Sequence, residues 1–263
     1  MVWGSNEWEV PDMNQYQLKE YINANPDTKL RDLVSQLIYD EIVALRISPG
    51  AKLNVTPISA SLGISRTPVT EAIAKLTEVG FVVSHPGQNG NFVLDLNLND
   101  MISLYQVRTA IESEAAALCA HNADDATVRE LSNLAEAFKD SVIRKDIRGM
   151  KDTDMPFHRL IIDSCGNPYI RQSYELLLPK LTMYQSSMLE FIGRSNNDNN
   201  PWMSSVKFNH TSVVSAIRMR MPLLARQSMA DHVDASMNFT TLSGNGADPF
   251  LFLRARHEHE PDE

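Results

Sequence analysis

Apolar residues recur at steps of three and four along most of the chain, which is the pattern of helices that bury one face. Six long segments in the second part of the chain carry this pattern, separated by short polar stretches with asparagine, glycine or proline. They are residues 99–121, 124–145, 150–165, 168–192, 203–218 and 222–241. We therefore expect this part of the chain to form an all-α antiparallel helical bundle.

Shorter helices are predicted before the bundle. A helical pattern runs from Leu30 to Leu45 and stops before the turn signal "SPG". The segment "TPISASLG" follows. Thr56 suits its N-cap, Pro57 its first helical position and Gly63 its C-terminal end.

The segment "SRTPVTEAIAKLTEVG" predicts one more helix, with Ser65 as its N-cap. Its apolar stripe consists of Val69, Ile73, Leu76 and Val79. The stripe leaves Arg66, Thr67 and Thr70 free at the N-terminal end of the helix.

Residues that favour β-strands follow in "FVVSH" and "NFVLDL", and the "PGQNG" between them predicts a hairpin. A helix, a helix–turn–helix and a hairpin in this order are typical of a winged helix. The chain is thus predicted to be mainly α, with an N-terminal winged helix-turn-helix domain before the bundle. The predicted organisation is a polar N-terminal extension (1–27), a winged-helix domain (28–96), a helical domain (97–241) and a disordered tail (242–263).

The composition is that of an ordinary globular protein, with 43% hydrophobic and 22% charged residues. No apolar run is long enough to span a bilayer, so we expect no membrane partner. The N-terminal segment lacks the features of a secretory signal. Two cysteines, Cys119 and Cys165, make no disulfide framework. These observations together predict a cytoplasmic protein.

The formal net charge of −9 is concentrated at the two ends of the chain. Residues 1–27 carry −4 and residues 242–263 carry −3, whereas residues 28–96 are neutral. The acidity therefore does not exclude nucleic acid as a partner. The neutral winged helix also lacks the basic footprint that phosphate binding normally leaves.

Three histidines are expected to point inward from three predicted helices. His158, His210 and His232 each share a helical face with apolar residues, and Asp154 precedes His158 by four residues. Imidazole and carboxylate are good ligands for zinc, nickel, iron or manganese. For each histidine taken alone, an ordinary core residue is the better explanation, and it is the group of three with an aspartate that indicates a metal site. Pro156 would allow the helix to begin near Thr153, which would make Asp154 an N-cap instead of a ligand.

The segments "GISRTPVTEAI" and "ISPGAKLN", with the hairpin between Phe81 and Leu94, resemble the winged-helix domain of the GntR family of bacterial transcription regulators. The segments "LYQVRTAIESEAAALCA" and "DMPFHRLIIDSCGNPYI" resemble the all-helical effector domain of the FCD, or FadR-like, subgroup. The resemblance covers roughly residues 30–240 in the order and spacing of the family.

The resemblance implies a homodimer that binds an operator palindrome in double-stranded DNA. It places Arg66 and Thr67 at DNA-contacting positions and Gly90 at the wing tip. Ser65 precedes them, and Thr56 and Thr70 stand where the family usually has arginines. The candidate DNA-binding residues are Thr56, Ser65, Arg66, Thr67, Thr70 and Gly90. A helix N-terminus offers free N–H groups to phosphate, and arginine can read guanine or phosphate. The alternative is that Arg66 is only a solvated surface residue, in a helix–turn–helix that serves packing and does not read DNA.

The resemblance further implies that Asp154, His158, His210 and His232 occupy the metal positions of the family, with zinc preferred over nickel, manganese or iron. A small organic acid would then bind as effector. Arg108 matches a family arginine that faces the effector cavity and can clamp a carboxylate. The alternative for Arg108 is an intrahelical ion pair with Glu112.

These features predict a regulator whose DNA affinity responds to a carboxylate effector at a metal site, and not an enzyme. A metal-dependent enzyme is one alternative, although no general base or nucleophile accompanies the ligands at recognisable spacing. A dimeric interaction module without specific DNA binding is another, because Thr56, Thr70 and the wing tip carry no charge.

Overall fold

The computed structural model describes residues 13–85, 87, 89–194, 201–243 and 250. The described residues divide into two compact units, with the boundary between Leu96 and Asn97. Phe250 belongs to the first unit and is buried. Apart from Phe250, the part of the predicted disordered tail beyond Ser243 lies outside the described residues.

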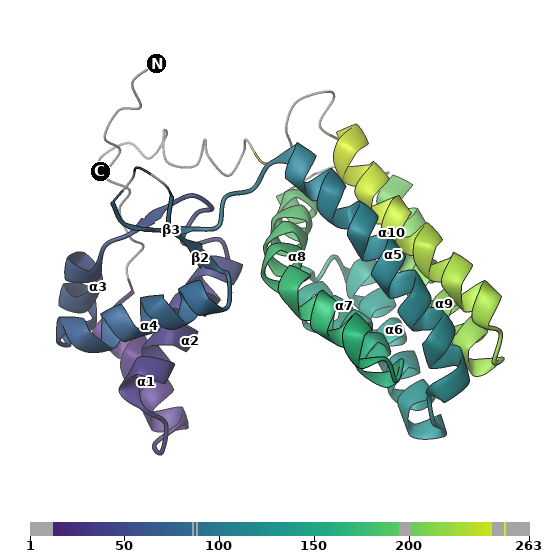
Figure 1. Ribbon diagram of the computed structural model, residues 1–263, viewed down its shortest axis with the longest axis horizontal. Coiled ribbons are helices and arrows are strands. Elements are labelled where there is room, and N and C mark those ends of the chain that lie inside the picture. Colours follow the sequence, from purple (N-terminus) through teal and green to yellow (C-terminus); the bar gives the residue numbers. More distant parts are fainter. Residues whose placement is uncertain (1–12, 86, 88, 195–200, 244–249, 251–263) are drawn as a thin grey trace. The chain divides into compact units, whose positions relative to one another are not determined.

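The first unit contains the elements of a winged helix–turn–helix, drawn at the purple-to-blue end of the chain in Figure 1. Its elements are α1 (Gln15–Ala24), α2 (Leu30–Val43), β1 (Lys52–Leu53), α3 (Val55–Leu62), α4 (Arg66–Glu78), β2 (Val82–Val83) and β3 (Asn91–Val93). The strands form an antiparallel sheet in the order β1-β3-β2, with Leu53 opposite Asn91 and Val82 opposite Val93. The sequence pattern did not predict β1, because a strand of two residues shows no alternation.

Two details of the helix–turn–helix differ from the sequence prediction. The helix α3 begins at Val55 with Asn54 at its N-cap, so Thr56 lies in the first turn and is not the N-cap. Val79 is 48% exposed, so the buried stripe of α4 ends at Leu76. Ser65 is the N-cap of α4, as predicted.

The helix α1 lies within the segment predicted as a polar extension. A capping box at Asn14 and Gln17 begins it, and Met13 and Leu18 are buried. It packs against α2 and α3. Part of residues 1–27 therefore belongs to the folded first unit.

The second unit is a helical bundle, shown from teal to yellow in Figure 1. Its helices are α5 (Leu98–Asn122), α6 (Asp125–Arg144), α7 (Ile147–Ser164), α8 (Pro168–Arg194), α9 (Pro201–Arg218) and α10 (Pro222–Ser243). The long helix α5 packs against α7, α8, α9 and α10. The predicted fold class, a winged helix–turn–helix followed by an all-helical unit, is confirmed.

The helix α7 corrects the prediction about Pro156. It begins at Ile147 with Asp146 as its N-cap, well before Thr153. Pro156 lies inside the helix on an exposed face, where water can satisfy the carbonyl that lacks a helical N–H partner. Asp154 is therefore an interior helical residue, one turn before His158 and on the same face.

No helix in the described part of the chain combines the length and the apolar character needed to cross a membrane. Cys119 and Cys165 are both buried and unbonded to each other.

Candidate metal centre and DNA-reading helix

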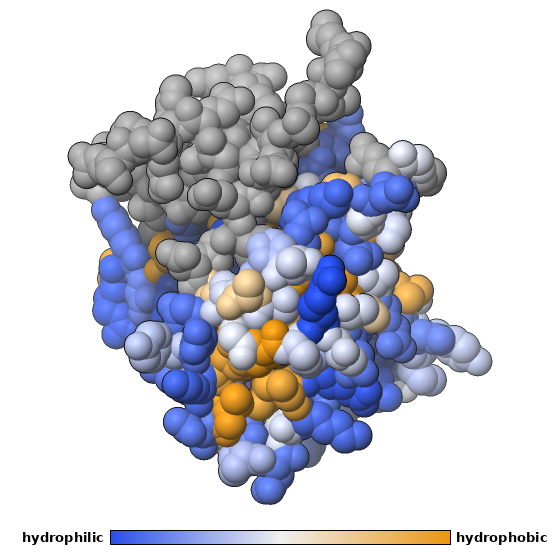
Figure 2. Space-filling model, turned by 90° about the vertical axis from the view of Figure 1, so that its left-hand side faces the viewer, coloured by the Kyte–Doolittle hydropathy of each residue, from blue (hydrophilic) through white to orange (hydrophobic). Residues whose placement is uncertain are grey.

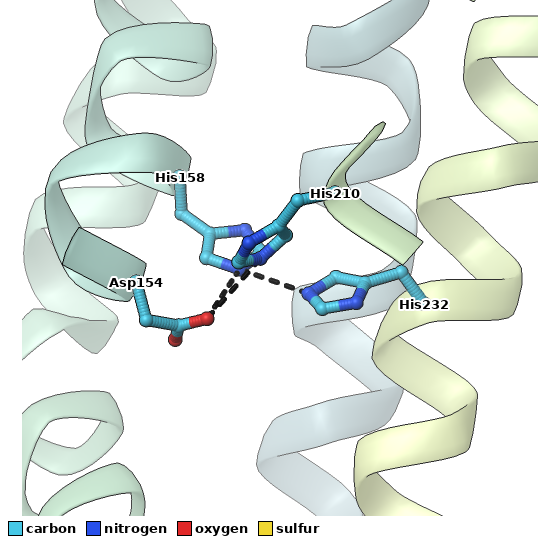
Figure 3. A group of neighbouring side chains, drawn as sticks. All are labelled: Asp154, His158, His210 and His232. Carbon is cyan, nitrogen blue, oxygen red and sulfur yellow. Dashed lines mark hydrogen bonds and ion pairs between the residues drawn. The ribbon is translucent and has the colours of Figure 1, made fainter. Parts of the chain in front are cut away.

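Four potential metal ligands meet inside the second unit. Asp154 and His158 come from α7, His210 from α9 and His232 from α10 (Figure 3). All four residues are buried, and one ligand atom from each lies within 4.8 Å of the others. The structure thus brings together the four residues that the sequence analysis selected.

The ligand atoms face one another at short range. His210 Nε2 lies 3.1 Å from Asp154 Oδ1, and His158 Nε2 lies 3.8 Å from the same oxygen. His232 Nε2 lies 3.1 Å from His158 Nε2. Ligands that each lie about 2.1 Å from one ion are roughly 3.0–3.4 Å apart at ordinary coordination angles. The spacing of the four residues is therefore close to what a single divalent ion requires.

The hydrogen bonding of the group also fits a cation. His210 Nε2 approaches Asp154 Oδ1 without forming a well-directed hydrogen bond, and neither His210 Nδ1 nor His232 Nδ1 has a partner among the described residues. Buried polar atoms are normally satisfied. Three imidazoles and a carboxylate that converge with several ring nitrogens left unpaired are a donor set suited to zinc or a related ion.

The electrostatics favour the metal-binding protonation state at Asp154, His210 and His232. Burial opposes a charge on His158, but the carboxylate of Glu112 raises the pKa of this histidine. Burial would raise the pKa of Asp154, but His158 and His210 hold this pKa well below its usual range. Burial lowers the pKa of His210, and burial together with the neighbouring histidines lowers that of His232 further. The carboxylate is therefore charged and these two imidazoles are neutral near pH 7, as ligands must be.

Further residues, two polar and one aromatic, surround the four potential ligands. Gln185 on α8 donates a short hydrogen bond to Asp154 Oδ2. Glu112 on α5 places Oε2 2.6 Å from His158 Nδ1, although the contact is not well aligned as a hydrogen bond. Phe157 stacks on His210 at 4.1 Å between ring centroids. The sequence analysis missed Gln185, which has no periodic or spacing relationship to the ligands.

Arg108 is buried and paired within its own helix. Its Nε donates to Glu112 Oε1 at 2.7 Å, and its guanidinium lies 5.2 Å from the ring centroid of Tyr105. Burial opposes the charge of Glu112, but Arg108 and His158 lower the pKa of Glu112 to about 2. The ion pair that the sequence analysis named as the alternative for Arg108 is therefore present in the structure.

The residues predicted to read DNA gather around the N-terminus of α4. Arg66, Thr67 and Thr70 are exposed. Arg66 Nη2 lies 2.6 Å from Thr56 Oγ1, which joins the first turns of α3 and α4. The Ser65 side chain makes no capping hydrogen bond. In the view of Figure 2, the residues that are coloured are mostly hydrophilic, around a smaller apolar area.

Gly90 lies between β2 and β3, as expected of the wing. Its φ of +135° disfavours other residues, and a Cβ there would lie 2.6 Å from Lys52 Cε. Lys52, on β1, therefore places a cation beside a wing tip that carries no charge of its own. The sequence analysis missed Lys52 because it did not predict β1.

Comparisons with known proteins agree with both units. Residues 30–93 match the bacterial regulatory proteins of the gntR family, and residues 103–235 match the FCD domain. The "Probable D-xylose utilization operon transcriptional repressor" of Paenarthrobacter nicotinovorans is 26% identical over 221 residues, covering 84% of this chain and 93% of the relative. The "HTH-type transcriptional repressor RspR" of Escherichia coli K12 is 26% identical over 137 residues, covering 52% and 60%.

The fold is also found among solved structures. E. coli McbR/YncC has a TM-score of 0.64 at 20% identity, covering 83% of this chain and 99% of that protein. A GntR regulator from Rhodococcus sp. RHA1 has a TM-score of 0.62 at 19% identity, covering 81% and 98%. The matched families and the named relatives are regulators of transcription, which overturns the alternative of a metal-dependent enzyme. The chain belongs to the GntR family of bacterial regulatory proteins, as a transcriptional regulator with a winged-helix DNA-binding domain and an FCD domain.

Proposed function

We propose that this regulator binds an operator palindrome as a homodimer in the cytoplasm, and that a small carboxylate effector changes its DNA affinity at a metal site in the FCD domain. The observation that carries the proposal is the convergence of Asp154, His158, His210 and His232 inside the helical unit. Zinc is the first candidate for the ion, with nickel, manganese and iron as alternatives.

The DNA contacts would come from the first turn of α4 and from the wing. Arg66 would reach a guanine edge or a phosphate, and Thr56, Thr67 and Thr70 would donate hydroxyls to phosphates. Ser65 and the free N–H groups at the start of α4 would meet a phosphate. One arginine gives few base contacts per monomer, so a dimer that binds two half-sites about one helical turn apart would supply the remaining affinity.

The effector would bind beside two positive groups of the second unit, the metal ion and Arg108. A divalent ion held by the four ligands would supply positive charge and coordination positions that a carboxylate oxygen can occupy. Arg108 would contribute a second cationic group. Its Nε engages Glu112, and a guanidinium carries two further amino groups in the same plane, which can bind a carboxylate bidentately.

Coupling to DNA requires that the effector favour one arrangement of the dimer over another, because a ligand shifts an equilibrium only by its differential affinity. Effector binding that changed the spacing of the two winged helices would change their fit to the half-sites. An effector that lowers DNA affinity would relieve repression. An effector that raises DNA affinity would allow activation.

The DNA part is tested by selecting fragments of the source genome on the purified protein at two salt concentrations. Arg66→Ala is compared with Arg31→Ala, an exposed arginine that pairs with acids inside the first unit. We expect enrichment of one palindrome by the wild type and Arg31→Ala, and a loss of about 1–3 kcal/mol of specific binding in Arg66→Ala. Absence of any enriched sequence would favour the alternative, a dimeric interaction module without specific DNA binding.

The metal and effector part is tested first by metal content and then by binding to the selected operator. Elemental analysis of the wild type should find one divalent ion per chain, and His210→Ala should lose it, whereas the exposed His121→Ala should keep it. Small carboxylates are then screened for a change in operator affinity. A response that persists in His210→Ala would contradict an effector site at the metal.

A further inference from the structure

Glu112 connects two residues that the sequence analysis treated separately. Its Oε1 accepts from Arg108 Nε at 2.7 Å, and its Oε2 lies 2.6 Å from His158 Nδ1. The side chains of all three residues are at most 5% exposed. Arg108 and Glu112 are one turn apart on α5, and His158 lies on α7. A buried chain of contacts therefore runs from Arg108 through Glu112 to a candidate metal ligand.

The position of Glu112 bears on which nitrogen of His158 holds a proton. A neutral imidazole carries its proton on one nitrogen and offers a lone pair on the other. A carboxylate beside Nδ1 favours the proton there, and a small rotation of either side chain would align Nδ1–H with Oε2. His158 Nε2, which faces Asp154 and His232, is then the atom with the lone pair.

His158 differs in this respect from the other two histidines. Among the described residues, none of the three Nδ1 atoms makes a well-aligned hydrogen bond, but Nδ1 of His158 has a carboxylate oxygen, Glu112 Oε2, at 2.6 Å. His158 is also the ligand that shares a helix with Asp154. Contact with Glu112 therefore ties the part of α7 that carries two of the four residues to α5.

We propose that Glu112 is a positioning residue for the metal centre, which orients His158 as a ligand through Nε2, and that Arg108 acts on the metal through Glu112. The inference rests on the proposed metal site and assigns Arg108 a role that does not depend on an effector. Carboxylates that hold a metal-bound histidine in this way contribute about 10- to 100-fold to metal affinity.

The test uses metal ions alone. Zn²⁺ affinity is measured by competition with a chromophoric chelator, and the absorption spectrum of bound Co²⁺ reports the ligand set. Glu112→Gln keeps the shape of the side chain but removes the charge, and Arg108→Gln removes the partner of that charge. Glu114→Gln is the matched control, because Glu114 lies on α5 in an ion pair with Arg226 and is 45% exposed.

We expect Zn²⁺ affinity to fall about 10- to 100-fold in Glu112→Gln. It should fall measurably in Arg108→Gln and stay unchanged in Glu114→Gln.

The outcomes separate this inference from the proposed function. A wild-type protein that binds no divalent ion overturns both. A wild type that binds metal and loses it in His210→Ala, while Glu112→Gln has wild-type affinity and an unchanged Co²⁺ spectrum, overturns the positioning role alone. Unchanged Zn²⁺ affinity in Arg108→Gln overturns the part assigned to Arg108.

A second measurement does not depend on the variants folding. Long-range ¹H–¹⁵N correlations of the zinc-loaded wild type identify the protonated nitrogen of each histidine. A proton on Nδ1 of His158 is the expected result, and a proton on Nε2 overturns the inference.

Discussion

Tyr184 and Gln185 are consecutive residues of α8 whose side chains hydrogen-bond to different parts of the helical unit. The Tyr184 hydroxyl lies 2.8 Å from Asp100 Oδ2 and 3.2 Å from Asn97 N, at the start of α5. Gln185 donates to Asp154 in the candidate metal centre. One turn of α8 thus contacts both the residue that begins the second unit and a candidate metal ligand.

Replacing Tyr184 by Phe should destabilise the helical unit without removing its metal. The buried hydroxyl bonds to a charged carboxylate, so its loss should lower the free energy of unfolding by about 1–3 kcal/mol. Urea unfolding of the zinc-loaded protein measures this loss. Tyr169→Phe, at a site that is 77% exposed, is the control and should change little. A drop in zinc content in Tyr184→Phe would contradict this expectation and would mean that the candidate metal centre depends on the contact between α8 and the start of α5.

Much of the candidate metal centre could be predicted because the placement of its residues depends on helical periodicity. Asp154 and His158 are four residues apart, and each histidine shares its face with buried apolar residues such as Ile161, Val213 and Met229. These are local relationships. Pro156 left open a start of α7 near Thr153, because the sequence does not show that this proline faces solvent inside a longer helix.

The surrounding residues depend on tertiary contacts, which no local pattern records. Glu112 was expected only as a partner of Arg108, and its second contact, with His158, links α5 to α7. Gln185 reaches Asp154 across 31 positions of the chain. Lys52 lies beside Gly90 only because β1 pairs with β3.

Removing the metal should selectively destabilise the second unit. A ligand that binds only the folded state stabilises it by RT ln(1 + [L]/Kd), about 2.7 kcal/mol when free metal is 100 times Kd. A chelator should therefore lower the melting temperature of the wild type and have no effect on His232→Ala. Equal melting temperatures with and without the chelator in the wild type would argue against a bound ion.

Cys119 should resist alkylation in the folded protein. Burial, with a smaller contribution from Cys165, raises the pKa of the Cys119 thiol to about 12. The raised pKa keeps the thiol neutral at pH 8, whereas an unfolded cysteine, with a pKa near 8.5, is partly thiolate there and reacts. Iodoacetamide labelling at pH 8 followed by peptide mass spectrometry should show modification of Cys119 only after urea is added. Rapid labelling in native buffer would mean that this part of α5 opens readily.

Lys52 should contribute to DNA binding although it lies outside the recognition helix. Its ammonium group is beside Gly90 in the wing, where "GQNGN" offers no other cation. Lys52→Gln should weaken binding to all DNA sequences alike and reduce the slope of log affinity against log salt by about one per monomer. Lys75→Gln is the control, because Lys75 Nζ already pairs with Asp32 at 2.9 Å. Fluorescence anisotropy across a salt series gives the slope for operator and unrelated duplexes. A change in sequence preference without a change in slope would mean that Lys52 contacts a base edge instead of a phosphate. An unchanged affinity would mean that Lys52 in the wing does not contact DNA.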